Sequence, residues 1–258
     1  MLFRSCVSML CACAMLAVTP ARAAETPNIA AASDLKFALE EIATAFTRAT
    51  GEKLALTFGS SGNFARQIRQ GAPFAMFLSA DEALVEGLAR DGVTKGSGDL
   101  YAIGRVVYFA PTGSQLVPDP DLASLKRALL AGRLARFAIA NPEHAPYGRA
   151  AKEALLNAGI WEAVEPRLVF GENVSQAAQF ATTGGADGGI FAYSLALSPA
   201  VGTKGTYVLI PESAHKPLRQ RMVLLKGAGP VAERFYAFVK GAEARAIFDR
   251  YGFTLPGQ

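Results

Sequence analysis

Short apolar segments alternate regularly with segments of helical periodicity along this chain. Residues 28–32 are short and apolar. Apolar side chains then recur at intervals of three and four residues, at Leu35, Leu39, Ile42 and Phe46. This spacing is that of one helix face, and the same change of period repeats along the chain. Strands that alternate with helices of about ten residues predict an α/β protein with parallel sheets covered on both faces.

The pattern assigns most of the chain to such elements. The expected strands cover residues 28–32, 53–58, 74–79, 104–110, 136–140, 168–170, 188–193, 207–210 and 220–225. The expected helices follow Ser33 and the turn at 60–63, and then cover residues 81–90, 122–130, 148–158, 173–182, 230–240 and 242–250. No long linker separates these elements, so we expect two lobes joined by strands that cross between them.

The first 23 residues predict an export signal. Arg4 supplies a positive charge, an apolar run extends over residues 6–18, and the helix-breaking Pro20 precedes an Ala-Arg-Ala ending. We expect cleavage after Ala23. A lipoprotein anchor at Cys13 is less favoured, because apolar chain follows this cysteine where a polar tether would be expected.

The three cysteines, at positions 6, 11 and 13, all lie in this predicted signal. The mature chain would then contain no disulfide, no thiolate metal site and no cysteine nucleophile. A chain of about 235 residues is large enough for its apolar core to stabilise it without disulfides.

The charge balance argues against a nucleic-acid partner. The chain has 26 basic and 22 acidic residues. Arg4 and Arg22 lie in the predicted signal, which leaves 24 basic against 22 acidic residues, a balance of +2. This charge is too weak for a nucleic-acid footprint, and no basic cluster compensates for it.

Three strand-to-helix junctions share a pattern that favours anion binding. They are Ala-Ala-Ala-Ser at 30–33, Phe-Gly-Ser-Ser-Gly-Asn at 58–63, and Gly-Glu-Asn-Val at 171–174. Each brings a small or uncharged residue to a helix start, where peptide N–H groups lack partners and the helix dipole is positive. A single serine there is more often a plain helix cap. Several such junctions at the carboxyl ends of strands would bind an oxyanion with neutral donors.

Catalytic patterns are weak in comparison. His144 and His215 lie in separate loops without metal-ligand spacing, and we expect them to pack in those loops or lie at the surface. The sequence shows no nucleophile elbow, Walker loop or dinucleotide fingerprint. A secreted serine hydrolase using Ser61 is a rival function, but the sequence identifies no base for it. Asp81 is expected to cap the helix that follows it.

The same junctions resemble those of the periplasmic molybdate-binding proteins of bacterial ABC transporters. The matching segments are residues 30–35, 58–68, 71–73, 77–81, 142–148, 171–174 and 248–253. They follow in order over nearly the whole mature chain. The resemblance implies an α/β, two-lobed periplasmic-binding-protein fold of type II, with two crossing strands between the lobes and the ligand in the cleft.

The lobe boundaries follow from this expected fold. Lobe 1 is predicted to comprise residues 24–108 plus 221–258, and lobe 2 residues 109–220. The crossings are expected near residues 108–110 and 218–223.

The resemblance also implies a ligand, molybdate or tungstate, held without a cationic side chain and without a cofactor. Ser33 and Ser61 would each donate a hydroxyl and a peptide N–H, while Tyr147 and Val174 would donate peptide N–H groups. No side chain would coordinate a metal, because molybdenum is bound as the oxyanion.

The protein would then be a periplasmic, monomeric binding protein that catalyses nothing and delivers its anion to a membrane permease. A binding protein for another oxyanion, such as sulfate, is the alternative. Phosphate is disfavoured, because its proton needs an acceptor and no carboxylate is clearly placed to accept it.

Some residues depart from the family pattern. Ala192 stands where some members place a tyrosine hydroxyl, and Tyr193 would point to the opposite face of a strand. We therefore predict that the Tyr147 hydroxyl, as well as its peptide N–H, binds the anion. Asp34 is expected to point outward, since a carboxylate in the cleft would repel a dianion. Ala75 replaces an expected Asp, and it is given no ligand role.

Overall fold

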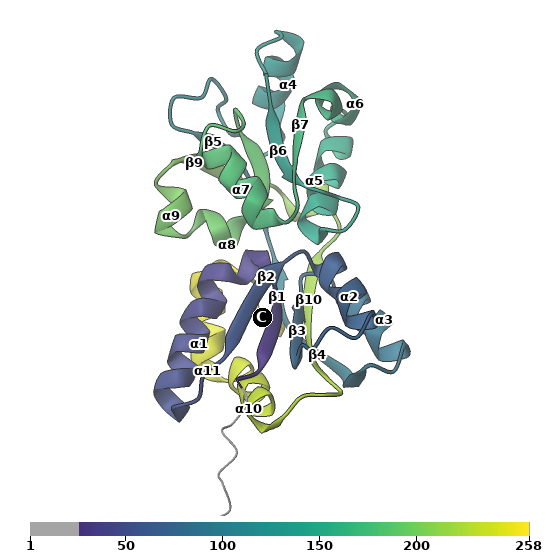
Figure 1. Cartoon of the computed structure of the whole chain (residues 1–258). Helices are drawn as coiled ribbons and strands as arrows, with labels where there is room; N and C mark the ends of the chain where they lie inside the picture. The colour runs from purple at the N-terminus through teal and green to yellow at the C-terminus, as the bar shows by residue number, and fades with distance from the viewer. Residues whose placement is uncertain (1–25, 258) are drawn as a thin grey trace, which may run out of the picture.

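The computed structural model describes residues 26–257 of the 258-residue chain. It consists of two α/β lobes that meet at a narrow waist (Figure 1). The predicted export signal, residues 1–23, lies outside the described residues. Within the described range, no helix combines the length and the apolar character that a membrane crossing requires.

Lobe 1 is built on a five-stranded sheet of order β2-β1-β3-β10-β4. Its strands are β1 (Asn28–Ala32), β2 (Ala55–Gly59), β3 (Met76–Ser79), β4 (Thr94–Gly104) and β10 (Leu218–Leu225). Its helices are the short 3-10 helix η1 (Ser33–Leu35), α1 (Lys36–Thr50), α2 (Ser61–Arg69), α3 (Glu82–Arg90), α10 (Pro230–Val239) and α11 (Ala242–Arg250). The predicted apolar face of α1 is buried, and Gly51 ends this helix in the left-handed conformation, with a φ of 75°.

Lobe 2 is built on a second five-stranded sheet of order β7-β6-β8-β5-β9. Its strands are β5 (Val106–Pro111), β6 (Phe137–Ala140), β7 (Leu168–Gly171), β8 (Gly189–Ala192) and β9 (Gly205–Leu209). Its longer helices are α4 (Ala123–Leu130), α5 (Pro146–Asn157) and α7 (Val174–Thr182). Its short helices are α6 (Trp161–Val164), η2 (Glu165–Arg167), α8 (Tyr193–Ala196), α9 (Pro199–Gly202) and η3 (Glu212–Ala214).

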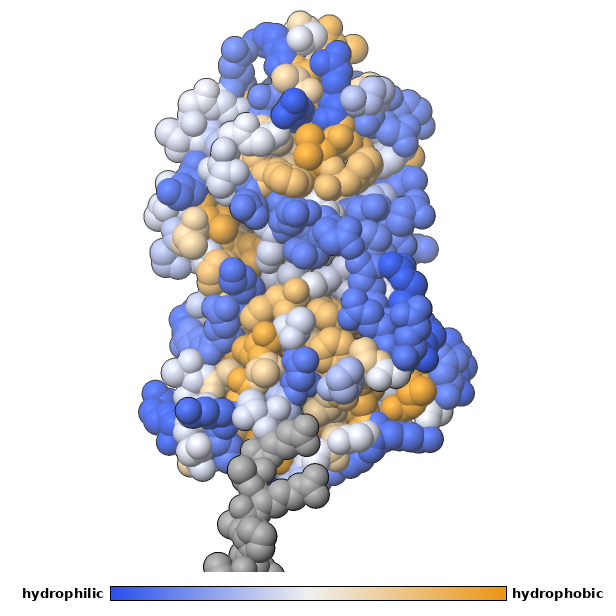
Figure 2. Space-filling model, in the orientation of Figure 1, coloured by the Kyte–Doolittle hydropathy of each residue, from blue (hydrophilic) through white to orange (hydrophobic). Residues whose placement is uncertain are grey.

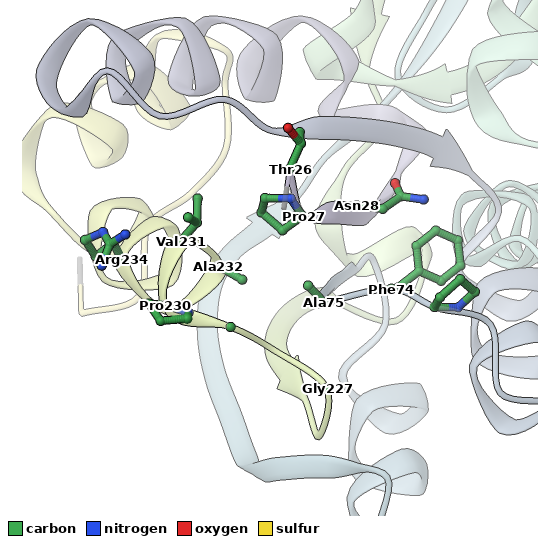
Figure 3. Close-up of a pocket in the computed structure, with 12 residues that line it drawn as sticks. Thr26, Pro27, Asn28, Phe74, Ala75, Gly227, Pro230, Val231, Ala232 and Arg234 are labelled. Carbon is green, nitrogen blue, oxygen red and sulfur yellow. The ribbon is translucent and has the colours of Figure 1, made fainter. Parts of the chain in front are cut away.

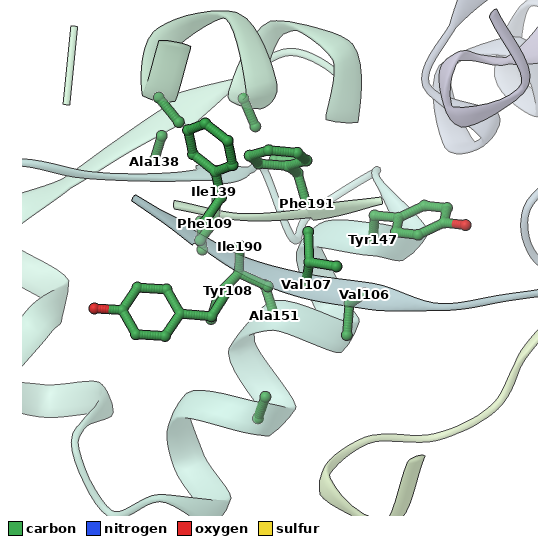
Figure 4. Close-up of a cluster of buried hydrophobic side chains, with 14 of the residues drawn as sticks. Val106, Val107, Tyr108, Phe109, Ala138, Ile139, Tyr147, Ala151, Ile190 and Phe191 are labelled. Carbon is green, nitrogen blue, oxygen red and sulfur yellow. The ribbon is translucent and has the colours of Figure 1, made fainter. Parts of the chain in front are cut away.

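Each lobe has its own hydrophobic core. The core of lobe 2 gathers around the aromatic rings of Tyr108, Phe109 and Phe191 (Figure 4). Phe137 packs edge-on against Tyr108, with 5.8 Å between ring centres. A separate buried cluster lies between α1, α10, α11 and the sheet of lobe 1. On the face shown in Figure 2, hydrophilic residues lie across the waist where the lobes meet.

The predicted two-lobed α/β fold is confirmed, but the prediction of parallel sheets is only partly right. Strand β10 runs antiparallel to β3 and β4, and β5 runs antiparallel to β8 and β9. The reason is the connection between the lobes. The parallel strands end toward the waist, whereas β5 and β10 start there because the chain has just arrived from the other lobe.

The chain passes between the sheets at two places. Strand β4 ends at Gly104 and β5 begins at Val106, so the first crossing is at Arg105. The second lies between Leu209 and Leu218. The crossings were expected a few residues later, and the predicted lobe boundaries at 108/109 and 220/221 fall inside β5 and β10. The first crossing joins two strands end to end, so no change in hydrophobic period marks it.

Candidate functional site

A small cavity lies where the two lobes face each other. Lobe 1 lines it with residues 32–34, residues 59–61 and Ala80, and lobe 2 with residues 145–147 and Val174. These residues lie at or just after the carboxyl ends of β1, β2, β3, β6 and β7. This edge is where open α/β sheets bind ligands.

All four residues predicted from the sequence line this one cavity. Ser33 is the first residue of η1, Ser61 the first of α2, Val174 the first of α7, and Tyr147 the second of α5. Peptide N–H groups in a first helical turn have no intrahelical acceptor. The four helix starts therefore concentrate free donors and positive dipole ends around one small space.

The local sequence explains how α5 and α7 begin. Pro146 occupies the first position of α5, where its lack of an N–H costs nothing. The first available N–H of α5 is therefore that of Tyr147. Asn173 caps α7, because its side-chain oxygen accepts a hydrogen bond from the peptide N–H of Gln176 at 3.1 Å. The N–H of Val174 is left without that cap.

The hydroxyls of Ser33 and Ser61 are both held in place by peptide donors. Ser61 Oγ accepts from the N–H of Ala80 at 3.0 Å, and Ser33 Oγ accepts from the N–H of Ser175 at 3.3 Å. A hydroxyl that accepts a hydrogen bond still has its own proton to donate. Both side chains are buried, so these two protons are oriented donors within a desolvated site.

Asp34 is buried, with 1% of its surface exposed, which contradicts the prediction that it points outward. Its Oδ2 accepts hydrogen bonds from Gln220 Nε2 at 2.7 Å and from the Tyr147 hydroxyl at 3.0 Å. Burial raises the pKa of Asp34 to about 6, against the opposing effect of these two hydrogen bonds. The prediction placed residue 34 at the start of an α-helix. It lies instead in a 3-10 turn, which directs side chains differently.

The Tyr147 side chain also departs from prediction. Its hydroxyl is directed out of the lobe 2 core (Figure 4), and it donates to Asp34 and accepts from Gln220 Nε2 at 3.1 Å. A phenol has only one proton to donate. In this structure that proton is donated to Asp34, so it is not available for the predicted hydrogen bond to the anion. Tyr193 packs against Tyr207, with 6.0 Å between ring centres, and does not line the cavity.

Contacts between the lobes surround the cavity. The carbonyl of His144 in lobe 2 accepts from Ser60 Oγ at 2.6 Å and from the Gly62 N–H at 3.0 Å. Ser194 Oγ donates to the carbonyl of Asp34 at 2.7 Å. Two side-chain pairs also join the lobes, Arg149 with Asp81 and Asn63 with Glu172.

The lining has no cationic side chain. Among the residues of the described chain, no lysine or arginine lines the cavity. Arg149 is paired with Asp81 outside it, and Asp81 also caps α3 as predicted. The described residues also contain no group of three His, Cys, Asp or Glu side chains placed to hold a metal ion. The cavity therefore offers neutral hydrogen-bond donors.

The geometry gives little support to a hydrolase that uses Ser61. The hydroxyl of Ser61 is hydrogen-bonded to the N–H of Ala80, and His144 contacts the neighbouring Ser60 instead, with 3.0 Å between Nδ1 and Oγ. Ser60 gives its proton to the His144 carbonyl, so the imidazole has no proton to abstract there. His215 is buried in its loop, with Nδ1 2.8 Å from the Lys216 carbonyl.

A larger open pocket lies at the opposite end of lobe 1, at the amino ends of β1 and β3 (Figure 3). Its lining includes Pro27, Phe74, Val231 and Arg234. Ala75, where an Asp was expected, lies here and not in the cleft. This pocket is at the wrong edge of the sheet for the ligand site of an open α/β protein, and the four predicted residues do not line it.

Comparisons of sequence and of structure both relate this chain to bacterial solute-binding proteins. Residues 27–254 match the family described as bacterial extracellular solute-binding protein. The molybdate-binding protein ModA of Rhodobacter capsulatus is 39% identical over 238 residues, which cover 91% of this chain and 90% of that protein. The solved periplasmic molybdate-binding protein of Azotobacter vinelandii superposes with a TM-score of 0.79 at 30% identity, covering 89% of this chain and 99% of that one.

A more distant likeness shows how widely the fold is used. The sulfate-binding protein SubI of Mycobacterium tuberculosis H37Rv superposes with a TM-score of 0.72, covering 90% of this chain and 87% of that one. The two sequences are only 16% identical. This likeness shows a shared fold, and it carries no argument about the ligand.

Proposed function

Since this chain belongs to the bacterial extracellular solute-binding proteins and, within them, to the family of the molybdate-binding proteins, we propose that it binds molybdate or tungstate in the cavity between its lobes. In this role the chain is the substrate-binding component of an ABC importer. It captures the anion in the periplasm and delivers it to the membrane permease, and no covalent step is involved.

The observation that carries this proposal is the set of uncharged donors around one cavity. Ser33 and Ser61 offer hydroxyl protons, and the first turns of four helices offer peptide N–H groups. Each hydrogen bond to a charged acceptor in a desolvated site contributes about 1.5–3 kcal/mol. Several of them together compensate for the removal of a dianion from water without an opposite charge.

Neutral donors in fixed positions also explain the expected selectivity. Molybdate and tungstate are nearly isosteric tetrahedral dianions, so a rigid ring of donors should bind them about equally well. Sulfate is smaller, and some donors would then be stretched or left unpaired. An unpaired buried donor costs about 1–3 kcal/mol, so several of them would weaken sulfate binding strongly.

The contacts between the lobes link binding to closure. Ser33 Oγ in lobe 1 accepts a hydrogen bond from the peptide N–H of Ser175 in lobe 2. In return, Ser175 Oγ donates a hydrogen bond to the Ser33 carbonyl at 2.8 Å. The site is therefore complete only when the two lobes meet. A permease that recognises the closed form would accept the loaded protein in preference to the empty one.

The test of this function is a calorimetric titration of molybdate into two serine variants. Ser61→Ala removes a hydroxyl donor at the cavity and should weaken Kd about ten- to hundredfold. Ser124→Ala is the matched control, since Ser124 is buried in lobe 2 beside the Tyr108 hydroxyl, at 3.3 Å. Equal Kd values for Ser61→Ala and wild type would contradict the proposed site.

A further inference from the structure

Asp34 has no role in the function proposed above, although it lines the cavity. Its Oδ2 is occupied by two donors, Gln220 Nε2 and the Tyr147 hydroxyl. Its Oδ1 is buried and has no well-aligned hydrogen-bond partner among the described residues, although the peptide N–H groups of Asp34 and Leu35 are close enough to the carboxylate to lower its pKa. A buried, half-satisfied carboxylate beside a site for a dianion requires a physical explanation.

The groups that face this carboxylate carry no positive charge. Tyr147 of α5 and Gln220 of β10 contact it directly, and Tyr101 of β4 donates to Gln220 Oε1 at 2.7 Å. Burial, with the charge of Asp34 as a smaller cause, raises the pKa of both tyrosines well above the usual value, so both are neutral. Ser194 of α8 reaches only the Asp34 carbonyl, and Ser175 of α7 reaches Ser33.

The anion must therefore face either a carboxylate or a carboxylic acid. An ionised Asp34 would place a third negative charge beside a dianion at a buried position, and no lysine or arginine is among the described residues that line the cavity. A nearby charge of the same sign disfavours the charged form of a group that can take up a proton, and therefore raises the pKa of a carboxyl group. Because burial already raises the pKa of Asp34 to about 6, Asp34 needs a smaller further shift to be neutral at pH 7.5 than an exposed aspartate would need.

We propose that Asp34 is a specificity-determining residue of this site, which takes one proton from solvent as the anion binds and is the uncharged acid in the loaded protein. This inference rests on the function proposed above. The proton is held on Oδ1, since Oδ2 already accepts two hydrogen bonds. The resulting O–H turns a repulsive group into one more neutral donor at the cavity.

This protonation state bears on which anions the site accepts. With Asp34 neutral, the hydroxyls and peptide N–H groups of the site all donate, which suits an oxyanion that carries no proton. Hydrogen phosphate carries a proton that needs an acceptor, and Asp34, the one acid among the described residues that line the cavity, would already be protonated. Phosphate is therefore rejected, although a carboxyl group lies at the cavity.

The proposal is tested by the proton balance of binding. Molybdate is titrated by calorimetry at pH 7.5 in two buffers with different ionisation enthalpies, neither of them an oxyanion. We expect uptake of about one proton per anion, and a Kd that rises about tenfold per pH unit between pH 6.5 and 8. Tight binding with no proton uptake and a Kd independent of pH would overturn the proposal.

The variant Asp34→Asn is a second test of the proposal, because the amide of asparagine has nearly the shape of the neutral carboxylic acid and carries no charge. Its oxygen can accept from Gln220 and Tyr147, and its NH₂ can replace the acid proton. We expect a folded protein with a Kd at pH 7.5 no weaker than wild type, no proton uptake and little pH dependence. A folded Asp34→Asn variant that binds molybdate more than tenfold more weakly would contradict the proposal.

The matched control is Asp91→Asn, a carboxylate paired with Arg69 at the surface, 2.7 Å away. This variant should keep the proton uptake of wild type. Titration with inorganic phosphate completes the test, since tight phosphate binding that is lost in Asp34→Asn would show an ionised Asp34 and overturn the proposal. If neither molybdate nor tungstate binds the wild-type protein, the proposed function itself fails. Binding without proton uptake removes only the present inference.

Discussion

At Tyr147 the backbone and the side chain serve different partners. Its peptide N–H belongs to the helix start that lines the cavity, while its hydroxyl joins Asp34 and Gln220 behind it. Gly104, the last residue of β4, allows this arrangement, because a Cβ there would lie 2.2 Å from the Tyr147 hydroxyl oxygen. The side chain therefore stabilises the junction of the lobes next to the first crossing.

This geometry predicts a mild effect for Tyr147→Phe. The hydroxyl lowers the pKa of Asp34 by donating to it, so its removal should raise that pKa. The neutral acid then persists to higher pH. We expect the molybdate Kd at pH 6.5 to change by less than about threefold, and the fall in affinity to begin at higher pH than in wild type. Calorimetric titrations over pH 6.5–8 measure both effects.

Tyr193→Phe is the matched control, because its ring packs on Tyr207 away from the cavity. It should leave both Kd and its pH dependence unchanged. A ten- to hundredfold loss at pH 6.5 in Tyr147→Phe would mean that this hydroxyl contacts the anion after all, as the sequence had suggested.

Local sequence predicts some of these residues and not others. Ser33, Ser61 and Val174 could be found because each stands at a strand-to-helix junction, a short-range pattern. The burial of Asp34 depends on Gln220, 186 positions further along the chain. No local pattern links these two residues, so the prediction for Asp34 rested on the repulsion between a carboxylate and a dianion, which favoured an outward side chain.

At the scale of single elements, the site depends on how its helices begin. The start of α7 is held by the Asn173 cap, and it presents Val174 to the cavity and Ser175 to Ser33. Frayed first turns would displace both peptide donors. The precision of the site is therefore a property of helix caps as well as of the residues that line the cavity.

Removal of this cap should cost both stability and affinity. Asn173→Ala is expected to destabilise the protein by about 0.5–2 kcal/mol, the usual cost of losing an N-cap, and to weaken molybdate binding. Chemical denaturation and calorimetry measure the two effects. Asp119→Ala is the control, since Asp119 accepts from the first-turn N–H groups of Ala123 and Ser124 at 2.6 and 2.7 Å, far from the cavity. If both variants weakened binding equally, helix capping would have no specific role at the site.

Sequence patterns predicted the positions of the longer helices well, but they missed a strand whose extended conformation depends on pairing with a distant strand. Helices α1, α3, α7, α10 and α11 lie within a few residues of their predicted ranges. Strand β4 was missed over most of its length, because the polar and glycine-rich composition of residues 95–99 is typical of a loop. Its pairing with β10 explains why this polar segment is extended.

At the scale of the whole molecule, two cores face each other across a cleft. Each lobe buries its own apolar cluster, and the contacts between the lobes near the cavity are largely polar. Such contacts are weak individually. A ligand that bridges both sides of the cleft should therefore add much to the stability of the closed protein.

Molybdate should raise the melting temperature. A ligand at a thousandfold excess over Kd stabilises the folded state by about 4 kcal/mol, which corresponds to a rise of roughly 8–16 °C for a protein of this size. Differential scanning calorimetry with and without molybdate measures the shift. A chloride solution of equal ionic strength is the control, and an equal shift with chloride would show a general salt effect instead of binding.

Overall architecture was the level that the sequence predicted best. Alternating strands and helices without a linker indicated two lobes, and the fold agrees. The direction of β5 and β10 was not predictable in the same way, because the hydrophobic pattern of a strand is the same in either direction.

In the function proposed above, neutral donors around one cavity select a tetrahedral dianion of a particular size. A calorimetric titration of the wild-type protein with molybdate, tungstate, sulfate and phosphate, under identical conditions near neutral pH, tests this selection. We predict tight binding of molybdate and tungstate with closely similar Kd values, sulfate binding weaker by at least about a hundredfold, and no measurable binding of phosphate. Sulfate binding as tight as that of molybdate, or a failure of molybdate to bind, would contradict this account.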